Sequence, residues 1–178
     1  MLQSEDFFLS SFESWRAASG IENFVLVGHS LGGYLSAVYA LRNPSRVDKL
    51  ILVSPAGIPT KPDGWDDRFS GPKAPFLYKL VRTLWQSNWT PQMLLRGAGH
   101  LGPRLMRTYS DRRFTTLDPE KVALLREYYY HINARAGSGE YALNTILTVG
   151  AFARKPLLYR LSGLKPPTAF LCTYIRVC

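Results

Sequence analysis

One pentapeptide constrains the fold of this chain more than any other feature. Gly28-His29-Ser30-Leu31-Gly32 fits the pattern G-x-S-x-G, and it stands between an apolar run at 24–27 and an apolar helical segment at 34–43. In this pattern the serine occupies a sharp, strained turn between a strand and a helix, which exposes its hydroxyl above a sheet. Glycines two residues on either side leave room for the turn. Because chance would supply only roughly 0.06 copies in a chain of this length, the pattern predicts a strand–turn–helix unit with Ser30 at its tip.

The surrounding segments predict an α/β fold. Residues 24–27 and 50–53 are short, continuous apolar runs, typical of strands buried on both faces of a parallel sheet, and 167–171 has the character of a third strand. Residues 4–19 have apolar side chains at helical spacing and are followed by Gly20, which favours a helix end. Helices that alternate with strands in this way indicate a parallel sheet flanked by helices.

Three regions differ in composition. Residues 1–57 contain the pentapeptide and the first two strands, and we interpret them as the core. Residues 58–155 start with a segment rich in Pro, Gly, Asp and Trp and continue with helical patterns, including a helix from Asp118 and another from Ser138 to about Phe152. We interpret 58–155 as a helical lid inserted between strands, and 156–178 as the return of the chain to the core.

Charge is distributed unevenly along the chain. The 178 residues, enough for one domain, carry a formal net charge of +9. Residues 1–60 contain four Lys or Arg and five Asp or Glu, so the excess of basic residues lies after them. A basic region of this kind suits phospholipid head groups or a membrane surface. We do not expect nucleic acid as a partner, because the sequence has neither a dense basic run nor an RNA-binding signature.

Other features narrow the class of protein. Cys172 and Cys178 form neither a zinc-site spacing nor a disulfide framework, and they suit a reducing compartment. No apolar run approaches the roughly 20 residues of a membrane span. Residues 1–6 lack the basic-then-apolar layout of a secretory signal. We therefore expect a cytoplasmic protein that has no metal or bound cofactor, with peripheral membrane contact left open.

A serine nucleophile also needs an oxyanion donor, and Leu31 is the expected one. Its backbone amide lies at the start of the helix after Ser30, where the helix dipole adds to the stabilisation of negative charge. The side chain of His29 is expected to point away from the nucleophile's direction. We therefore expect His29 to line a substrate pocket or to brace the turn rather than to act as the base.

The other members of a catalytic triad are not evident in the sequence. A nucleophilic serine needs a histidine base and a carboxylate that orients it, in the chain order Ser, acid, His. His100 and His131 both fall in the predicted lid, where a structural role is the simpler interpretation, and no Asp or Glu follows Thr168. We expect that these 178 residues do not complete the triad in that order.

Three stretches carry a resemblance to a known family. They are 27–34, 52–57, and 127–134 with the following Ser138-Gly139-Glu140. The first stretch occurs in many hydrolases, whereas the third, in the predicted lid, is far more specific. Through these stretches the chain resembles the α/β-hydrolase-domain proteins four and five, their plant relatives, and fungal cardiolipin-deacylase and lysophosphatidate-acyltransferase relatives. The resemblance extends over almost the whole chain, as far as residue 171.

The resemblance implies a partial α/β-hydrolase fold with a helical lid, and a serine enzyme that acts on lipid esters. Such proteins deacylate phospholipids or lysophospholipids, and some transfer acyl groups from acyl-CoA, as a co-substrate, to lysophosphatidic acid. One branch has lost the serine and works as a lipase co-activator, so the presence of Ser30 favours the catalytic branches. The resemblance implies peripheral association with a membrane or lipid-droplet surface. It does not distinguish between the lipid droplet, the endoplasmic reticulum and the mitochondrion. The alternative is a non-catalytic lipid-surface or lipase-partner-binding protein.

Arginines of the predicted lid are candidate ligands for a lipid head group. Arg104 and Arg107, with Arg112 and Arg113 nearby, are candidates to meet a phosphate group or an anionic membrane. The alternative interpretation of these residues is an ordinary solvated helix face.

Two departures from the family bear on activity. The family has further strands before the present start, including the loop that gives the second oxyanion amide, and it continues after Leu171 with an acidic turn and a segment of the form H-x-x-x-x-D. The positions five residues after the three histidines hold Tyr34, Leu105 and Ala136 instead of Asp. We expect a truncated fragment in which strand 24–27 has an open edge that is prone to aggregation. By itself it should be poorly folded and inactive.

Overall fold

The computed structural model describes residues 2–66 and 75–171. These residues form two compact units. The first unit extends to Arg82 and resumes at Thr145, and the second comprises Thr83–Asn144. Cys172 and Cys178, and with them part of the predicted return segment 156–178, lie outside the described residues.

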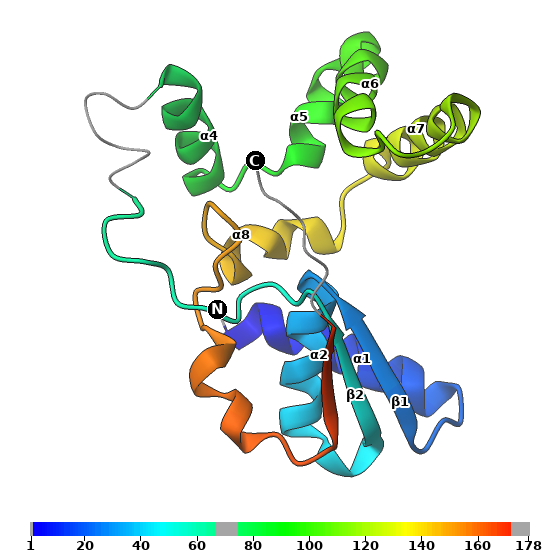
Figure 1. Ribbon diagram of the computed structural model, residues 1–178, viewed down its shortest axis with the longest axis vertical. Coiled ribbons are helices and arrows are strands. Elements are labelled where there is room, and N and C mark those ends of the chain that lie inside the picture. Colours follow the sequence, from blue (N-terminus) through cyan, green and yellow to red (C-terminus); the bar gives the residue numbers. More distant parts are fainter. Residues whose placement is uncertain (1, 67–74, 172–178) are drawn as a thin grey trace. The chain divides into compact units, whose positions relative to one another are not determined.

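A parallel three-stranded sheet is the centre of the first unit (Figure 1). Its strands are β1 (Phe24–His29), β2 (Val47–Val53) and β3 (Thr168–Leu171), in the order β1-β2-β3. Leu26 pairs with Leu50 between β1 and β2, and Leu52 pairs with Phe170 between β2 and β3. All pairings are parallel, which confirms the α/β class and the three strands that the apolar runs predicted.

Two helices, α1 (Leu2–Ala18) and α2 (Leu31–Arg42), cover one face of this sheet. Side chains of α2 and of alternate β2 positions make the core, because successive residues of a strand point to opposite faces. The aromatic ring of Phe12 on α1 packs edge-on against Tyr39 on α2 and against Phe24 on β1. The most deeply buried apolar residues of the first unit are Tyr34, Ala37, Val38, Tyr39, Ala40, Leu50, Leu52 and Leu157.

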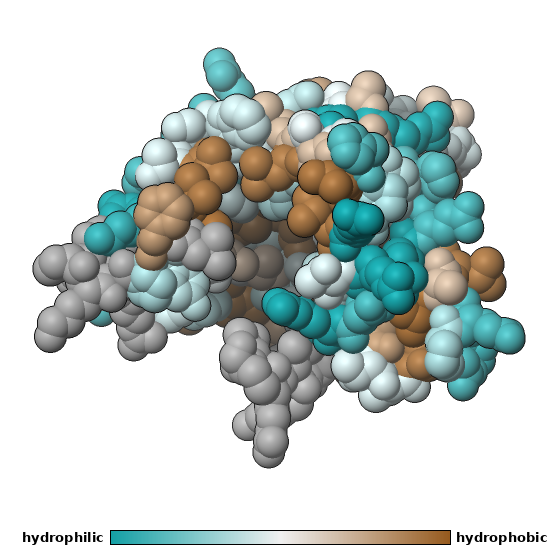
Figure 2. Space-filling view, turned by 90° about the horizontal axis from the view of Figure 1, so that it is seen from above, coloured by the Kyte–Doolittle hydropathy of each residue, from teal (hydrophilic) through white to brown (hydrophobic). Residues whose placement is uncertain are grey.

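The expectation that strand 24–27 is buried on both faces was wrong. Val25 and Val27 are 54% and 60% exposed, whereas Leu26, between them, is half-buried. Both helices lie on the Leu26 side, and among the described residues β1 pairs only with β2. A continuous apolar run therefore predicts the strand correctly, but it does not predict whether other elements cover one face of the strand or both. Figure 2 shows that apolar side chains also reach the surface beside hydrophilic ones on the face it draws.

The chain returns to the first unit through short turns rather than through the long helix expected from Ser138 to about Phe152. A 3₁₀ turn (Gly139–Ala142) and α8 (Leu143–Ile146) are followed at once by an isolated antiparallel bridge between Leu147 and Ala153. Gly150 has a φ of 92°, which no α-helix accepts. Two further 3₁₀ turns, Leu157–Tyr159 and Leu161–Gly163, then lead to β3.

The second unit is helical. It contains α5 (Pro91–Gly97), a 3₁₀ turn (Gly99–Leu101), α6 (Gly102–Arg113) and α7 (Pro119–Ala134), and the end of α4 (Phe76–Gln86) belongs to it. Thr90 caps α5 by accepting a hydrogen bond from the Met93 amide at 3.1 Å. The helix expected from Asp118 is confirmed as α7. The predicted limits of the lid, 58–155, stay a prediction.

No helix within residues 2–66 and 75–171 combines the length and the apolar character that crossing a bilayer requires. In the same residues, no three His, Cys, Asp or Glu side chains come together as a metal site would need.

Candidate active site

Ser30 is the single residue between β1, which ends at His29, and α2, which begins at Leu31. Its backbone has φ 53° and ψ −121°, a positive φ that non-glycine residues rarely adopt. Strain of this kind costs about 1–3 kcal/mol and persists only where the surroundings enforce it. The serine is solvent-exposed. The strained strand–turn–helix unit predicted from the pentapeptide is therefore present.

Backbone hydrogen bonds hold this turn against the end of β2. The Ser30 amide donates to the Val53 carbonyl at 3.1 Å, and the Ala56 amide donates to the Ser30 carbonyl at 2.9 Å. The same carbonyl accepts the Tyr34 amide at 3.2 Å, which closes the first turn of α2. The position of Ser30 is thus fixed by three bonds to two different segments.

Two glycines, Gly28 and Gly33, leave room for the turn, whereas the pattern predicted Gly28 and Gly32. A Cβ at Gly28 would collide with the Ser36 hydroxyl and lie 2.6 Å from the Gly32 carbonyl oxygen, and a Cβ at Gly33 would lie 2.8 Å from Pro55 Cβ. A Cβ at Gly32 meets no atom within 4 Å. The expectation that both motif glycines avoid a collision was right for Gly28 and wrong for Gly32, because Gly32 faces outward and Gly33 faces Pro55.

The Leu31 amide lies beside the exposed serine at the first position of α2. Amides in the first turn of a helix have no acceptor within that helix, and the helix dipole makes this end attractive to negative charge. The geometry therefore offers a hydrogen-bond donor next to a strained, exposed serine.

Comparison with known proteins agrees with this geometry. The profile of the alpha/beta hydrolase fold family matches residues 4–75. A 1-acylglycerol-3-phosphate O-acyltransferase of Arabidopsis thaliana is 43% identical over 175 residues, covering 95% of this chain and 42% of that protein. The chain has the α/β-hydrolase fold in part and is similar to this family. The predicted resemblance and fold class are confirmed.

Two further relatives and one solved structure extend the comparison. A (lyso)-N-acylphosphatidylethanolamine lipase of Homo sapiens is 37% identical, over 96% of this chain and 49% of that protein. The 1-acylglycerol-3-phosphate O-acyltransferase ABHD5 of Sus scrofa is 36% identical, over 91% and 46%. The crystal structure of a membrane phospholipase A, described as a bacterial virulence factor, superposes with a TM-score of 0.59 at 22% identity, over 94% of this chain and 46% of that one. The chain thus spans about half the length of the curated relatives it matches.

The three histidines of the chain are divided between the two units. His29 is exposed at the end of β1, where it pairs in register with Val53. His100 and His131 belong to the second unit, and His131 lies 3.9 Å from Glu127 on its own helix. Among the described residues of the first unit, no histidine or carboxylate forms a hydrogen bond with the Ser30 hydroxyl. The predicted roles of Ser30, Leu31 and His29 stay predictions.

The arginines predicted to contact substrate are exposed on α6 of the second unit. Arg104 has no ion pair with a described residue, and Arg107 lies 3.7 Å from Asp111 one turn later. Their proposed contact with a head group stays a prediction.

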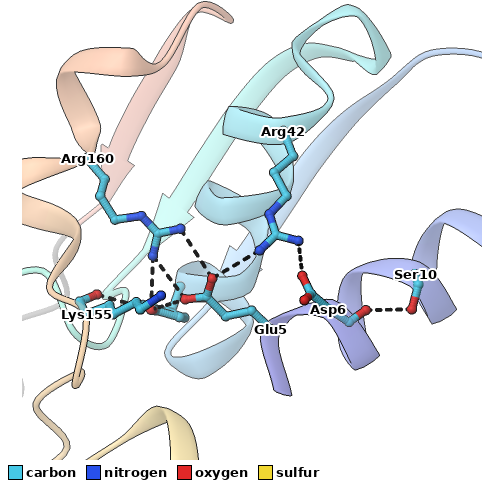
Figure 3. Close-up of polar contacts among 7 residues, drawn as sticks. Glu5, Asp6, Ser10, Arg42, Lys155 and Arg160 are labelled. Carbon is cyan, nitrogen blue, oxygen red and sulfur yellow. Dashed lines mark hydrogen bonds and ion pairs between the residues drawn. The ribbon is translucent and has the colours of Figure 1, made fainter. Parts of the chain in front are cut away.

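The sequence did not predict a buried polar cluster around Glu5 (Figure 3). Glu5 of α1 is 3% exposed. It accepts hydrogen bonds from the Tyr34 hydroxyl at 2.6 Å and from Arg160 at 3.0 Å, and it lies 3.4 Å from Arg42. Burial raises the pKa of Glu5, but the hydrogen bonds from Arg160 and Tyr34 outweigh it, so the pKa lies below its ordinary value.

This cluster, Glu5 with Tyr34, Arg42 and Arg160, joins two distant segments, α1 and the turn at Arg160, to α2. Arg160 follows Glu5 by 155 positions, and its guanidinium also donates to the Tyr34 hydroxyl at 3.2 Å. Tyr34 lies one helical turn after Ser30 and bonds to it through the backbone. The hydrogen bonds of the Tyr34 side chain within this cluster therefore hold the first turn of α2 in place. The sequence placed Glu5 only at the start of a helix, and no local signal links it to Arg160.

Proposed function

We propose that Ser30 is the nucleophile of a phospholipid or lysophospholipid acyl hydrolase or acyltransferase, in a longer protein that contains these residues. The observation that carries the proposal is the strained, exposed serine at the strand–helix junction, with the first amide of α2 beside it. The names of the relatives, which pair acyl transfer to acylglycerol phosphate with lipid hydrolysis, support the choice of lipid esters.

The chemistry follows from the position of the two groups. The Ser30 oxygen attacks the acyl carbonyl carbon while its proton passes to a histidine base, and the Leu31 amide helps to hold the resulting oxyanion. Collapse breaks the ester bond, the leaving alcohol or thiol takes the proton, and the acyl group remains on Ser30. Water as the next acceptor gives hydrolysis, and a lysophospholipid gives transfer. In transfer, acyl-CoA is the proposed donor. The protein uses no bound cofactor in this scheme.

The proposed location is the cytoplasmic surface of a membrane or a lipid droplet. Its support is the excess of basic residues after position 60, which favours an anionic lipid surface. His29, Arg104 and Arg107 are the proposed substrate contacts of the whole protein.

The 178 residues by themselves are proposed to be inactive. Among the described residues of the first unit, no histidine is hydrogen-bonded to the Ser30 hydroxyl, and a serine without its base loses nearly all of its nucleophilic advantage. The same observation favours the second candidate function, a non-catalytic lipid-surface or lipase-partner-binding protein.

Fluorophosphonate labelling separates the two candidates. The longer protein should label at Ser30, and Ser30→Ala should abolish the label. Ser10→Ala is the matched control, because Ser10 is exposed on α1 in ordinary helical geometry and its loss should change nothing. The 178-residue chain should label far more slowly than the longer protein. If the folded longer protein does not label at Ser30, the catalytic proposal is wrong and the binding function is favoured.

A further inference from the structure

Helix α6 of the second unit exposes apolar side chains along one face. Leu105 is 51% exposed and Tyr109, one turn later, is 54% exposed. Residues four apart on a helix are neighbours on its surface. Leu101, one turn before Leu105, is 45% exposed, so the apolar face continues back into the preceding 3₁₀ turn.

An apolar groove lies next to this face. It has a volume of about 490 Å³ and is formed by α5, α6 and α7 within the second unit. Leu105 and Tyr109 form one wall, and Leu94 of α5, itself 43% exposed, belongs to another. Met106 and Tyr129 also line the groove. The exposed side chains of α6 therefore border a space able to receive further apolar groups.

The basic residues of α6 surround the same face. The helix contains four arginines and one aspartate. Asp111 is already engaged, by Arg126 at 2.7 Å and by Arg107 at 3.7 Å. Arg104, Arg112 and Arg113 have no carboxylate partner in the part of the chain that the structure describes.

Arg112 and Arg113 lie next to the exposed apolar side chains of α6. They line a shallow depression together with Leu105, Thr108 and Tyr109. Unpaired positive charge and exposed apolar side chains thus meet on one surface, which we call the α6 face and define by Leu105, Tyr109, Arg104, Arg112 and Arg113.

A second apolar patch in the same unit shows that exposure alone does not select the α6 face. On α7, Leu124 is 69% exposed and Tyr128 is 60% exposed. Glu120 and Glu127 lie one turn before and after Leu124, and the nearby Lys121 is paired with Asp118 at 2.9 Å. The α7 patch is as apolar as the α6 face but has acidic neighbours, so an anionic surface would repel it.

We propose that the α6 face binds the surface of an anionic phospholipid membrane. The arginines would contact lipid phosphates, while Leu105 and Tyr109 would enter the boundary between head groups and acyl chains. The choice of a phospholipid surface rests on the proposed lipid function. RNA would use the same charges, but it would not cover the aliphatic Leu105 and Leu94.

Vesicle flotation tests this face in the longer protein that contains these residues. All variants also carry Ser30→Ala, so that no lipid is turned over during the experiment. The membrane-binding result therefore does not depend on whether Ser30 is a catalytic nucleophile. Vesicles of phosphatidylcholine alone are compared with vesicles containing phosphatidic acid. Partitioning to the acidic vesicles should fall on the order of 30-fold in Arg112→Gln/Arg113→Gln, since two basic residues are lost. It should also fall when salt is raised.

The matched control is Lys121→Gln/Arg135→Gln, which lowers the net charge of the same unit by the same amount at two exposed positions. It should retain nearly all binding, and circular dichroism shows whether both variants are folded. Equal losses in the two double variants would mean that only overall charge matters, and the proposal would then be wrong. Binding of an RNA oligonucleotide with no binding to acidic vesicles would overturn it as well.

A fluorescent label tests the apolar half of the α6 face independently of charge. An environment-sensitive dye is attached at Leu105→Cys, with Cys172 and Cys178 replaced by serine, and compared with the same dye at Leu124→Cys. Emission should shift to the blue with acidic vesicles at position 105 only. Equal shifts at both positions would indicate general adsorption of exposed apolar groups, and no shift at position 105 would exclude its insertion.

Discussion

The Tyr34 hydroxyl lies 2.6 Å from the Glu5 carboxylate, although the two residues are 29 positions apart. Because Tyr34 follows Ser30 by one helical turn, this contact joins α1 to the turn that holds the candidate nucleophile. Arg160 and Arg42 approach the same carboxylate, so its negative charge is compensated where it is buried. Removing one member of such a group leaves the others buried without a partner.

Glu5→Gln should therefore destabilise the chain by about 1–3 kcal/mol, the range for leaving a buried polar group without its partner. Urea denaturation at pH 7 measures the loss. Asp6→Asn is the control, because Asp6 is next in sequence and pairs with Arg42, but its side chain is 51% exposed and an exposed pair contributes at most about 1 kcal/mol. Similar losses in the two variants would show that Glu5 is not held as the structure describes.

The same carboxylate predicts how stability depends on pH. The folded-state pKa of Glu5 is lower than its unfolded value of 4.5. Its contribution is therefore complete above pH 4.5 and is lost as the pH falls below that value toward the folded pKa. Between pH 7 and pH 3, the free energy of unfolding should decline more steeply in the wild type than in Glu5→Gln. Parallel pH profiles for the two proteins would contradict this.

Glu13 should titrate unusually low. Hydrogen bonds from Arg16 and from the Tyr39 hydroxyl lower the pKa of Glu13 from 4.5 to about 2. Carboxyl-carbon NMR across pH 2–6 measures this pKa directly. Arg16→Gln removes the first cause and should move the pKa back toward its ordinary value, whereas Tyr39→Phe should move it less. A wild-type pKa that stays near 4.5 would rule out the contacts at 3.0 Å and 2.7 Å between Glu13 and Arg16.

Local patterns predicted the parts of the fold that depend on neighbouring residues. The apolar runs identified the strands, and the pentapeptide gave the strained serine, because a strand–turn–helix junction is specified within about ten residues. The Glu5–Arg160 pair was not predictable, since 155 positions separate the two residues. The helix expected from Ser138 to about Phe152 was wrong because Gly139–Ala142 form a 3₁₀ turn, α8 ends at Ile146 and Gly150 takes a positive φ, which composition alone does not show.

The three glycines of the turn should differ in their tolerance of alanine. Gly28→Ala and Gly33→Ala introduce a Cβ against the backbone of Gly32 or the ring of Pro55, and should each cost roughly 1–3 kcal/mol or more through overpacking. Gly32→Ala meets open space in a helix and should be neutral or stabilising by up to about 1 kcal/mol. Denaturant unfolding of the three variants checks the order. A Gly32→Ala variant as unstable as Gly28→Ala would mean that the turn packs differently.

The exposed side of β1 predicts self-association. Val27 is 60% exposed on a strand that pairs only with β2 among the described residues, so β1 presents apolar side chains together with unpaired backbone groups. Val27→Lys places a charge there and should reduce aggregation, measured by light scattering at increasing protein concentration. Leu124→Lys makes a comparable apolar-to-lysine change at an exposed helical position and should have a smaller effect, because a helix has no open hydrogen-bonding edge. If the two lysines suppress aggregation equally, then net charge rather than the strand edge governs association.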